Sequence, residues 1–541
     1  MRRLRAWLLI GLAAVVVLIV VALVAIPRVV DTPRIQALIA TTVSQNLGRP
    51  VKFSDVSIRI LPLPSVVLKD LEVAEDPAFG QGPFLRLKEA IVRLRLRSLL
   101  LLRVELGDFI LTHPMISLVQ APDGRWNFTM LGAHAEPRPT GRARGGGGAA
   151  GGAGTAGVLG GRIKIEDGVV TYEPRAGGAT ARYRVEELGL TMSGSALSTL
   201  TFTGGAKVKP GDVTVKIEDG NLVANGARAL ADAPVRAKIT VDGKEIRDLV
   251  ALAMGPAPII AGGVKGTLAV SGTLAHARAT GEVELPNLVM TQTQPSCPEP
   301  KKRSLALGTV KVNATWEPPR FLGRPVTATL VGGTVTTNLT ATLDQGVRVD
   351  LADLTVKGAA IEKVLVDFLC QGYAATGLTD VTGTLGLRPT DLWRTLNGQG
   401  RVQIGAGRVV GTQALALLGN LTRVGGALSS IIRGEIPNLG AAPVEYDGVT
   451  ATYTITNGVV STRDFLLSSR VLKIAAAGTY TLGTGAMNLD VGVTNGRTEL
   501  RAKVAGTASS PSIRVSPSAA LRDVDPARVE KDLQELLKKF R

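Results

Sequence analysis

The sequence is poor in aromatic residues, which make up 4% of its 541 residues, and it holds only three histidines and two cysteines. So few aromatics argue against packed helices with large aromatic cores, and they leave few rings for stacking nucleic-acid bases. The histidines, His113, His134 and His276, lie in separate segments and lack the spacing of metal ligands. Two cysteines can form one bridge but not a disulfide scaffold.

Sequence motifs of catalytic sites are also missing. The chain has no G-x-S-x-G element, Walker loop or protein-kinase set. Glu166-Asp167 and Glu218-Asp219 each precede a glycine, so turn chemistry explains these carboxylates without acid–base work. Residues 405–411 differ in spacing from a dinucleotide-binding loop, which favours a hairpin there. We therefore expect no enzyme activity, no catalytic residue, no metal and no cofactor.

One long hydrophobic run stands out against this background. Residues 6–26 carry no charge, and as a helix at ~1.5 Å per residue they span roughly 31 Å, the thickness of a bilayer core. Arg2, Arg3 and Arg5 precede the run, so the positive-inside tendency places residues 1–5 in the cytoplasm and the body across the membrane. A cleaved signal peptide would have an apolar core of only about 7–15 residues. We expect an uncleaved anchor that includes Trp7, Leu8 and Ile26.

Glycine is abundant, with 63 residues, and the formal net charge is +17. Frequent glycines between stretches of Val, Thr, Leu and Ala are typical of many short strands joined by tight turns. The positive charge indicates either a solvated arginine-rich surface or attraction to anionic lipid head groups. Nucleic acid is not an expected partner, because the basic residues are not interleaved with stacking aromatics.

Local patterns then predict the elements. Residues 32–47 have helical spacing, and from Val51 the hydrophobic period changes to two, as in strands. Between Val92 and Arg97, aliphatic residues alternate with Arg93, Arg95 and Arg97, which would face solvent or lipid head groups. Further strands of about ten residues end in Asp-Gly, Gly-Gly or Gln-Gly pairs, which we expect to be hairpin turns. Short helices are expected at 359–370 and 411–432, and an amphipathic helix at 525–540.

The motifs of both ends resemble one family. The N-terminal motifs are Gly48-Arg49-Pro50-Val51, Leu61-Pro62-Leu63-Pro64, Leu68-Lys69-Asp70-Leu71, Leu99-Leu100, Pro114 and Asp123-Gly124-Arg125-Trp126-Asn127. The C-terminal ones are Leu396-Asn397-Gly398-Gln399-Gly400, Asn457-Gly458-Val459, Leu466, Ser468, Gly478, Tyr480, Leu482 and Val504-Ala505-Gly506-Thr507 with Pro511. Behind a single anchor, this order resembles the AsmA family of envelope proteins, over residues 1–130 and 355–517.

The resemblance implies an inner-membrane protein of a two-membrane bacterium, single-pass, with its N-terminus in the cytoplasm and its body in the periplasm. Related TamB-like proteins resemble bridge-type lipid-transfer proteins. We therefore expect a mainly β fold: a transmembrane helix, then an elongated, curled antiparallel β-sheet that forms an apolar groove, with a few short helices. The expected regions are 1–5 (cytoplasmic), 6–26 (anchor), 27–132 (AsmA-like helix and β region), 133–161 (Gly-rich flexible linker), 162–355 (middle β-groove), 356–517 (AsmA-like C-terminal β region) and 518–541 (amphipathic helix).

A one-sided apolar sheet must be covered by a second sheet, by closure into a barrel, or by a ligand. Small aliphatic side chains suit acyl chains, since each buried CH₂ contributes about 0.8 kcal/mol. The residues expected to line the groove are Val56, Ile58, Ile60, Val92, Leu94, Leu96, Ile116, Leu118, Val213, Val215, Ile217, Val402, Ile404, Leu489, Val491 and Val493. Cys297 and Cys370 could form a disulfide or stay free thiols.

The leading hypothesis is an anchored periplasmic protein that binds phospholipids and moves them between the inner and outer membranes, aided by an outer-membrane or periplasmic protein partner. The alternative is a scaffold or chaperone for outer-membrane protein assembly that captures client strands by β-augmentation. A third reading, a secreted adhesin-like β-solenoid, requires cleavage of the anchor.

Overall fold

The computed structural model describes residues 37, 40–41, 43–45, 47–59, 63–95, 106–129, 131, 162–175, 182–194, 199–223, 230–255, 257–293, 297–343, 346–370, 374–410, 445–470, 473–495, 498–507 and 510–516. The predicted anchor with Trp7, Leu8 and Ile26, the linker at 133–161, the helices at 411–432 and 525–540, and Ile60 and Leu96 lie outside these residues. Within them, no helix has the length and apolar character needed to cross a bilayer.

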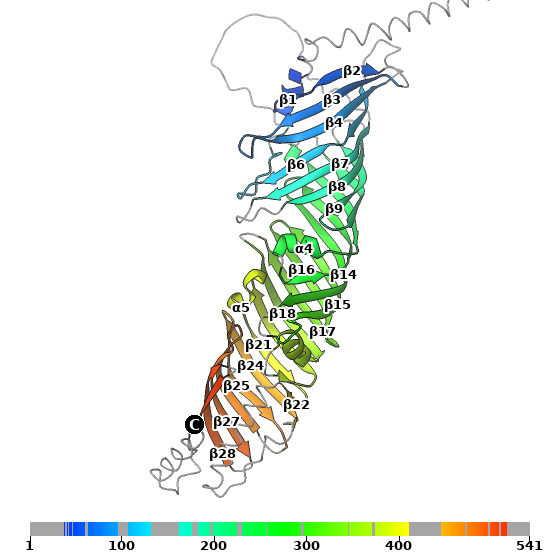
Figure 1. The fold of residues 1–541 in the computed structure, drawn as a ribbon. Helices are drawn as coiled ribbons and strands as arrows, with labels where there is room; N and C mark the ends of the chain where they lie inside the picture. The colour runs from blue at the N-terminus through cyan, green and yellow to red at the C-terminus, as the bar shows by residue number, and fades with distance from the viewer. Residues whose placement is uncertain are drawn as a thin grey trace, which may run out of the picture. The chain divides into compact units, whose positions relative to one another are not determined.

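The fold is mainly β, as the alternating sequence predicts, and it divides into two compact units (Figure 1). Unit 1 comprises residues 1–249 and 264–281, and unit 2 comprises 250–263 and 282–541. Helix α4 (Arg247–Met254) and strand β14 (Ala277–Thr293) each contain a boundary between the units. Between residues 37 and 47, the described residues are helical, which agrees with the helix predicted there.

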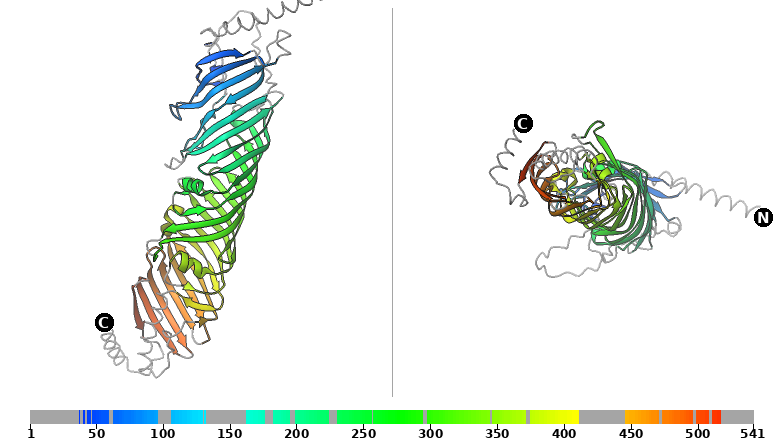
Figure 2. Two further views of the ribbon diagram at one scale, coloured as in Figure 1. Left: turned by 45° about the vertical axis from the view of Figure 1, so that its right-hand side comes forward. Right: turned by 90° about the horizontal axis from the view of Figure 1, so that it is seen from below.

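Unit 1 is a curled sheet of strands that mostly pair antiparallel with their neighbours along the chain (Figure 2). A short 3₁₀ helix, η2 (Leu230–Asp232), comes directly before the strand that begins at Pro234. The strands are β1 (Val51–Lys52), β2 (Asp55–Arg59), β3 (Ser65–Ala74), β4 (Pro83–Leu94), β5 (Leu106–Thr112), β6 (Met115–Gln120), β7 (Arg162–Pro174), β8 (Tyr183–Ser193), β9 (Leu200–Lys209), β10 (Val213–Leu222), β11 (Pro234–Gly243) and β13 (Val264–Thr273).

The antiparallel prediction is wrong at one place in unit 1. Strands β5 and β6 both pair with β4 on one side, and both pair parallel with β7 on the other. β5 and β6 therefore occupy one strand position, between β4 and β7, and are separated by His113 and Pro114. Parallel neighbours need a long crossover, and residues 121–161 are that connection. The glycine-rich stretch thus lies in the link between two parallel strands.

Unit 2 continues the antiparallel pattern, with a π-helix, η3 (Lys363–Phe368), where a short helix is predicted. It also has η4 (Pro389–Asp391) and α5 (Leu392–Thr395). Its strands are β12 (Ile259–Ala261), β15 (Lys302–Glu317), β16 (Arg320–Leu330), β17 (Gly333–Thr342), β18 (Arg348–Ala359), β19 (Ala374–Ala375), β20 (Thr379–Leu387), β21 (Asn397–Ile404), β22 (Gly407–Val410), β23 (Glu445–Tyr446), β24 (Gly448–Thr456), β25 (Val459–Ser468), β26 (Lys473–Thr481), β27 (Ala486–Asn495), β28 (Thr498–Thr507) and β29 (Ser510–Ser516).

Two turn predictions are corrected. The hairpin expected at 405–411 is not formed, because β22 pairs with β19 and β23 in a separate three-stranded sheet and not with β21. Asp167-Gly168 and Asp219-Gly220 are not turns either, since they lie inside β7 and β10. Both aspartates have left-handed backbones, with φ of 52° and 51°, and the pairing register shifts beside them. They are β-bulges, which bend a strand and need the left-handed conformation that Asp tolerates.

Candidate functional site

One face of the unit 1 sheet is aliphatic across its width. Residues paired across neighbouring strands lie on the same face of a sheet. One such row, here called the Ile239 row, consists of Val56, Leu68, Ala90, Leu111, Ile165, Leu190, Gly204, Ile217, Ile239 and Leu268. The adjacent row on the opposite face is polar and includes Lys216, Thr240 and Thr267. The two faces therefore differ sharply in polarity.

A second aliphatic row, the Val213 row, follows the same face. It consists of Val51, Val73, Leu85, Ile116, Val170, Val185, Val208, Val213, Gly243 and Val264. In β10, Val213 and Ile217 are four residues apart, so both rows share a face. In β7, Ile165 and Val170 are five apart, and the bulge at Asp167 absorbs the odd residue. The bulges thus keep the face aliphatic where strict alternation would turn it polar.

Unit 2 has the same division of its faces. One aliphatic row joins Ala328, Val335, Val356, Val381, Val402 and Ala451. A second row begins at the buried Thr379 and continues with the aliphatic residues Ile404, Val449, Leu467, Ile474 and Val493. The opposite face carries the row Thr336, Thr355, Thr382, Arg401 and Thr452. Each unit therefore presents a one-sided sheet.

The predicted groove residues that the structure describes fall on these aliphatic faces. In unit 1, Ile116 and Val213 belong to one row and Val56 and Ile217 to the other, while Val215 lies between them. Ile58, Val92, Leu94 and Leu118 pair with Val66, Phe109, Leu106 and Tyr172. In unit 2, Val402, Ile404, Leu489, Val491 and Val493 are paired with other aliphatic residues or with glycine. The first set belongs to unit 1 and the second set to unit 2.

The cover over the apolar face changes along unit 1. Val51, Val73 and Phe84 form a buried cluster, the N-terminal cluster, on which Val43, Leu47, Phe128 and Leu131 pack together with Ile116 and Leu118. Further along the Ile239 row, the side chains of Ile165, Leu190, Ile217, Ile239 and Leu268 are only partly buried. Among the described residues, the one sheet besides the large one is β19-β22-β23 of unit 2. No second sheet of described residues therefore covers this part of unit 1.

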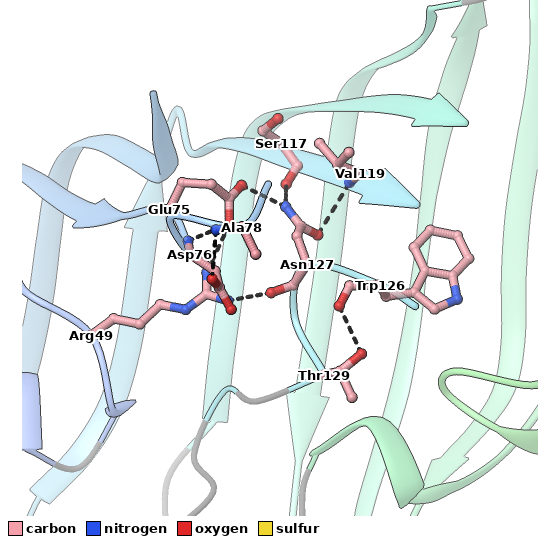
Figure 3. A network of polar contacts seen from close by, with 9 residues as sticks. All are labelled: Arg49, Glu75, Asp76, Ala78, Ser117, Val119, Trp126, Asn127 and Thr129. Carbon is pink, nitrogen blue, oxygen red and sulfur yellow. Dashed lines mark hydrogen bonds and ion pairs between the residues drawn. The ribbon is translucent and has the colours of Figure 1, made fainter. Parts of the chain in front are cut away.

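A buried polar network fixes the segment that covers the N-terminal cluster (Figure 3). The Arg49 guanidinium is 3.1 Å from the Glu75 carboxylate, and these side chains are only 6% and 5% exposed. Arg49 also donates to the carbonyl oxygen of Asn127, and its guanidinium lies over the Phe84 ring, 5.0 Å from the centroid. The Asn127 amide donates to Glu75 at 2.6 Å and to the Ser117 carbonyl at 2.7 Å. Every one of these buried polar groups is thus paired, as burial requires.

Sequence reasoning used Arg49 and Asn127 only as marks of the resemblance and missed Glu75. Arg49 is 26 positions from Glu75 and 78 positions from Asn127 in the sequence. No local sequence pattern links residues that far apart. The signal that could have found them is the pairing rule: a charged residue inside an aliphatic region needs an opposite charge nearby.

Aromatic residues, scarce in the chain, gather beside this network. Trp126 stacks on Tyr172 with ring centroids 5.3 Å apart, and Tyr172 stacks on Tyr183 at 6.0 Å. Phe128 lies 5.5 Å from Trp126. The indole N–H donates to the carbonyl oxygen of Ala275 at 3.2 Å, beyond the end of β13. Burial raises the pKa of both tyrosines, so they stay neutral hydrogen-bonding groups at physiological pH.

The two cysteines form a disulfide, which decides between the alternatives that the sequence leaves open. Cys297 follows β14 and is only 4% exposed, and Cys370 follows η3. The bond joins residues 73 positions apart and ties the loop before β15 to the end of η3. It is a structural link within unit 2.

Other charged groups of unit 1 that the sequence singled out lie on a solvated surface. His113 pairs with Asp167 at 2.8 Å, and both side chains are about half exposed. Arg93 lies 3.8 Å from Asp108, which matches the solvated-face reading of that strand, and Arg97 lies outside the described residues. Within the parts of the chain that the structure describes, no group of His, Cys, Asp and Glu side chains could hold a metal ion.

The polar face of unit 2 contains an open hollow of about 1080 Å³, lined in part by Thr382, Arg401, Thr452 and Arg463. Nearby, the backbone N–H and the hydroxyl of Thr452 both donate to Asp464 at 2.8 Å, which lowers the pKa of that carboxyl. The hollow is hydroxyl-rich and carries basic groups, unlike the aliphatic face behind it.

Comparison with known families gives one match: the model described as the AsmA family matches residues 1–244. The match reaches beyond residue 130, where the N-terminal motifs end, and takes in most of unit 1. It does not include residues 355–517, so the resemblance of the C-terminal region stays a prediction. A search of curated proteins found no match.

Proposed function

Because the chain belongs to the AsmA family, we propose that it is an inner-membrane-anchored envelope protein whose apolar sheet faces bind phospholipid acyl chains. Residues 6–26 would be the anchor, the β body would lie in the periplasm, and lipids would travel between the inner and outer membranes. The proposal includes no enzymatic step.

The observation that carries the proposal is the partly uncovered aliphatic face of unit 1. From β7 to β13, the Ile239 row is apolar, while its neighbour on the other face carries Lys216, Thr240 and Thr267. Ile217, Ile239 and Leu268 are partly exposed, and an extended apolar surface of this kind marks a site that something apolar covers.

The composition of this surface suits lipid acyl chains. The rows consist of Val, Ile, Leu, Ala and Gly, whose side chains are short and carry no polar atoms. Each CH₂ that leaves water contributes about 0.8 kcal/mol wherever it binds along such rows. The free energy of a bound chain then changes little from step to step, so lipids can slide while their head groups stay in water.

A first experiment asks whether lipid is bound at all. The full chain is purified from membranes in a mild detergent, the detergent is exchanged for one of distinct mass, and the protein is extracted with organic solvent. We expect phospholipid by mass spectrometry, in amounts above those of an anchored control protein that lacks the β body. A lipid content equal to that of the control would refute the proposal.

A matched pair of variants places the lipid on the proposed face. Ile239→Asp puts a charge among the aliphatic residues, whereas Thr240→Asp puts the same charge on the next residue, on the opposite face. We expect Ile239→Asp to lower bound lipid at least roughly tenfold, since removing a charge from water costs several kcal/mol, and Thr240→Asp to retain it. Equal losses in the two variants would contradict the assignment.

One observation favours the alternative function, client-strand capture. Among the described strands, β29 pairs only with β28, so its other edge can accept a strand by β-augmentation. Pro511 lies on this strand and removes one N–H from it, which is a usual way to protect an edge. Deleting the gene separates the two functions: loss of outer-membrane barrels with unchanged lipid balance would favour capture.

A further inference from the structure

The aliphatic rows of unit 1 are continuous, but the protein does not cover them evenly. Val213 is 4% exposed, and Leu200, Leu222 and Val235 form a second buried cluster on the same face, whereas Ile217 and Ile239 between them are partly exposed. The Val213 row begins with Val51 and Val73, which are 5% and 2% exposed, in the N-terminal cluster. The Ile239 row begins with Val56, which is fully buried, and reaches Ile239 and Leu268, which are partly exposed. The same face therefore holds a closed core at its N-terminal end and a stretch of partly exposed aliphatic side chains farther along, at Ile217, Ile239 and Leu268.

Residues 121–129 and 131, here called the Trp126 segment, lie where the cover changes. Phe128 and Leu131 pack on the N-terminal cluster, in the same set of contacts as Ile116 and Leu118. Trp126 stacks on Tyr172, which pairs across the sheet with Leu118 and Tyr183. The segment therefore lies on the aliphatic face, over β6 and β7.

The segment is held at both ends of its contact surface. On one side, Asn127 is 1% exposed, and besides its bonds to Glu75 and Ser117 it exchanges two hydrogen bonds with Val119, at 2.9 and 3.1 Å. On the other side, Trp126 donates to Ala275, 149 positions away in the sequence. Lifting the segment would leave Arg49 and Glu75 without their amide partner and would expose Phe128. Such a buried, fully paired network disfavours partial opening.

We propose that the Trp126 segment is a stopper that ends the hydrocarbon-binding site of unit 1. Acyl chains occupy the face from β7 to β13, with Trp126 as the last protein group they touch, and they do not reach the face of β1 to β6. Lipids consequently enter across the open side of the sheet, not past its first strands. The inference rests on the proposed function and names the part of the face that performs it.

Photo-crosslinking tests both the limits of the site and its existence. In the full chain, p-benzoylphenylalanine replaces one residue at a time. Ile239 and Leu268 test the aliphatic face, and Ile116 tests the part under the stopper. Two controls are Met115, the neighbour of Ile116 in the sequence, which is 57% exposed, and Thr240 on the polar face. Cells are irradiated, and the purified protein is examined by mass spectrometry for phospholipid adducts. We expect adducts at Ile239 and Leu268, and at least tenfold less at the other three positions.

The outcomes separate the two claims. Adducts at Ile116 as frequent as at Ile239 would overturn the stopper while leaving lipid binding intact. No adduct at any position would overturn the proposed function and the stopper together.

Tryptophan fluorescence gives an independent check that does not replace a covered residue. In a variant in which Trp7, Trp316 and Trp393 are Phe, the remaining Trp126 reports on its own surroundings. Reconstitution with phospholipids brominated on the acyl chains should quench Trp126 at least twofold relative to unbrominated lipid. No quenching, with lipid still bound, would overturn the placement of Trp126 at the end of the site.

Discussion

The N-terminal cluster of unit 1 and a buried cluster at the C-terminal end of unit 2 are covered in different ways. Both bury the aliphatic face of a one-sided sheet. In unit 1, Val51, Val73 and Phe84 are covered by residues from an added segment and a helix, and a buried ion pair lies beside them. The second, here called the C-terminal cluster, consists of Ile404, Tyr446, Val449, Leu467, Ile474, Met487, Val491 and Val504.

The difference shows what each kind of cover requires. Most of the C-terminal cluster comes from consecutive strands β24 to β28, so the alternating pattern that makes the strands also makes the core. In unit 1, the covering segment must be directed to one place, and apolar contacts alone do not select it. Arg49, Glu75 and Asn127 provide that selection, because each is satisfied only when the segment is in position.

The largest effect should come from removing the cation of the unit 1 network. Arg49→Met leaves the Glu75 carboxylate buried without a partner, and we expect the free energy of unfolding to fall by about 3–5 kcal/mol. Urea unfolding measures it, followed by the fluorescence of Trp126 in the background in which Trp7, Trp316 and Trp393 are Phe. Arg59→Met is the matched control. Arg59 pairs with Glu89 but is 52% exposed, so the free energy of unfolding should fall by less than about 1 kcal/mol. Equal losses would mean that the network does not select the segment.

Unit 2 carries a covalent link in place of such a network. Replacing Cys297 and Cys370 by Ser opens a loop with a sequence separation of 73, and loop-closure entropy predicts a loss of about 4 kcal/mol. Thermal unfolding of the double variant, monitored by circular dichroism, should show the transition of unit 2 shifted down and that of unit 1 in place. A shift of both transitions would show that the two units unfold together.

Removing the two methyl groups of one valine tests the core of the C-terminal cluster. Val504 is 0% exposed, so Val504→Ala leaves a cavity and should lower the free energy of unfolding by about 2 kcal/mol. Its neighbour Lys503 is exposed on the other face, and Lys503→Ala should change the free energy by no more than about 0.5 kcal/mol. Denaturant titration compares the two. An effect at Lys503 as large as at Val504 would contradict the assignment of faces.

The smallest effect is a loss of stability at alkaline pH. Burial raises the pKa of Tyr446 to about 12, whereas an unfolded tyrosine ionises near pH 10. The unfolded state therefore loses its proton first, so stability is unchanged below pH 10 and falls as the pH rises toward 12. We expect Tyr446 to account for about 1 kcal/mol of this loss at pH 11. Unfolding of the wild type and of Tyr446→Phe at pH 9 and 11 measures it, and the same loss in both would refute it.

Much of the fold follows from alternation alone. Val213, Val215 and Ile217 were predicted to share a face because they alternate with polar residues, and the pairing places them so. The parallel neighbours β5, β6 and β7 were not predictable in this way. β7, the parallel partner of β5 and β6, follows a glycine-rich connection. The alternation within a strand does not indicate whether its neighbour runs parallel or antiparallel.

The bulges show a second limit of sequence reasoning. Asp167-Gly168 and Asp219-Gly220 have the composition of hairpin turns, because turns and bulges both use left-handed residues. Only the pairing on both sides shows that the strand continues. The network of Arg49, Glu75 and Asn127 was missed for a related reason, since its members meet only after the sheet has formed.

Pairing between successive strands also bears on how such a protein can change its size during evolution. Among the described strands from β25 to β28, each pairs with the strand before it and the strand after it in the chain. An inserted or deleted hairpin would therefore leave every other pairing intact, as in repeat proteins built from nearest-neighbour contacts. It would change the width of the sheet by about 10 Å, so the length of the apolar face can change without redesigning a core.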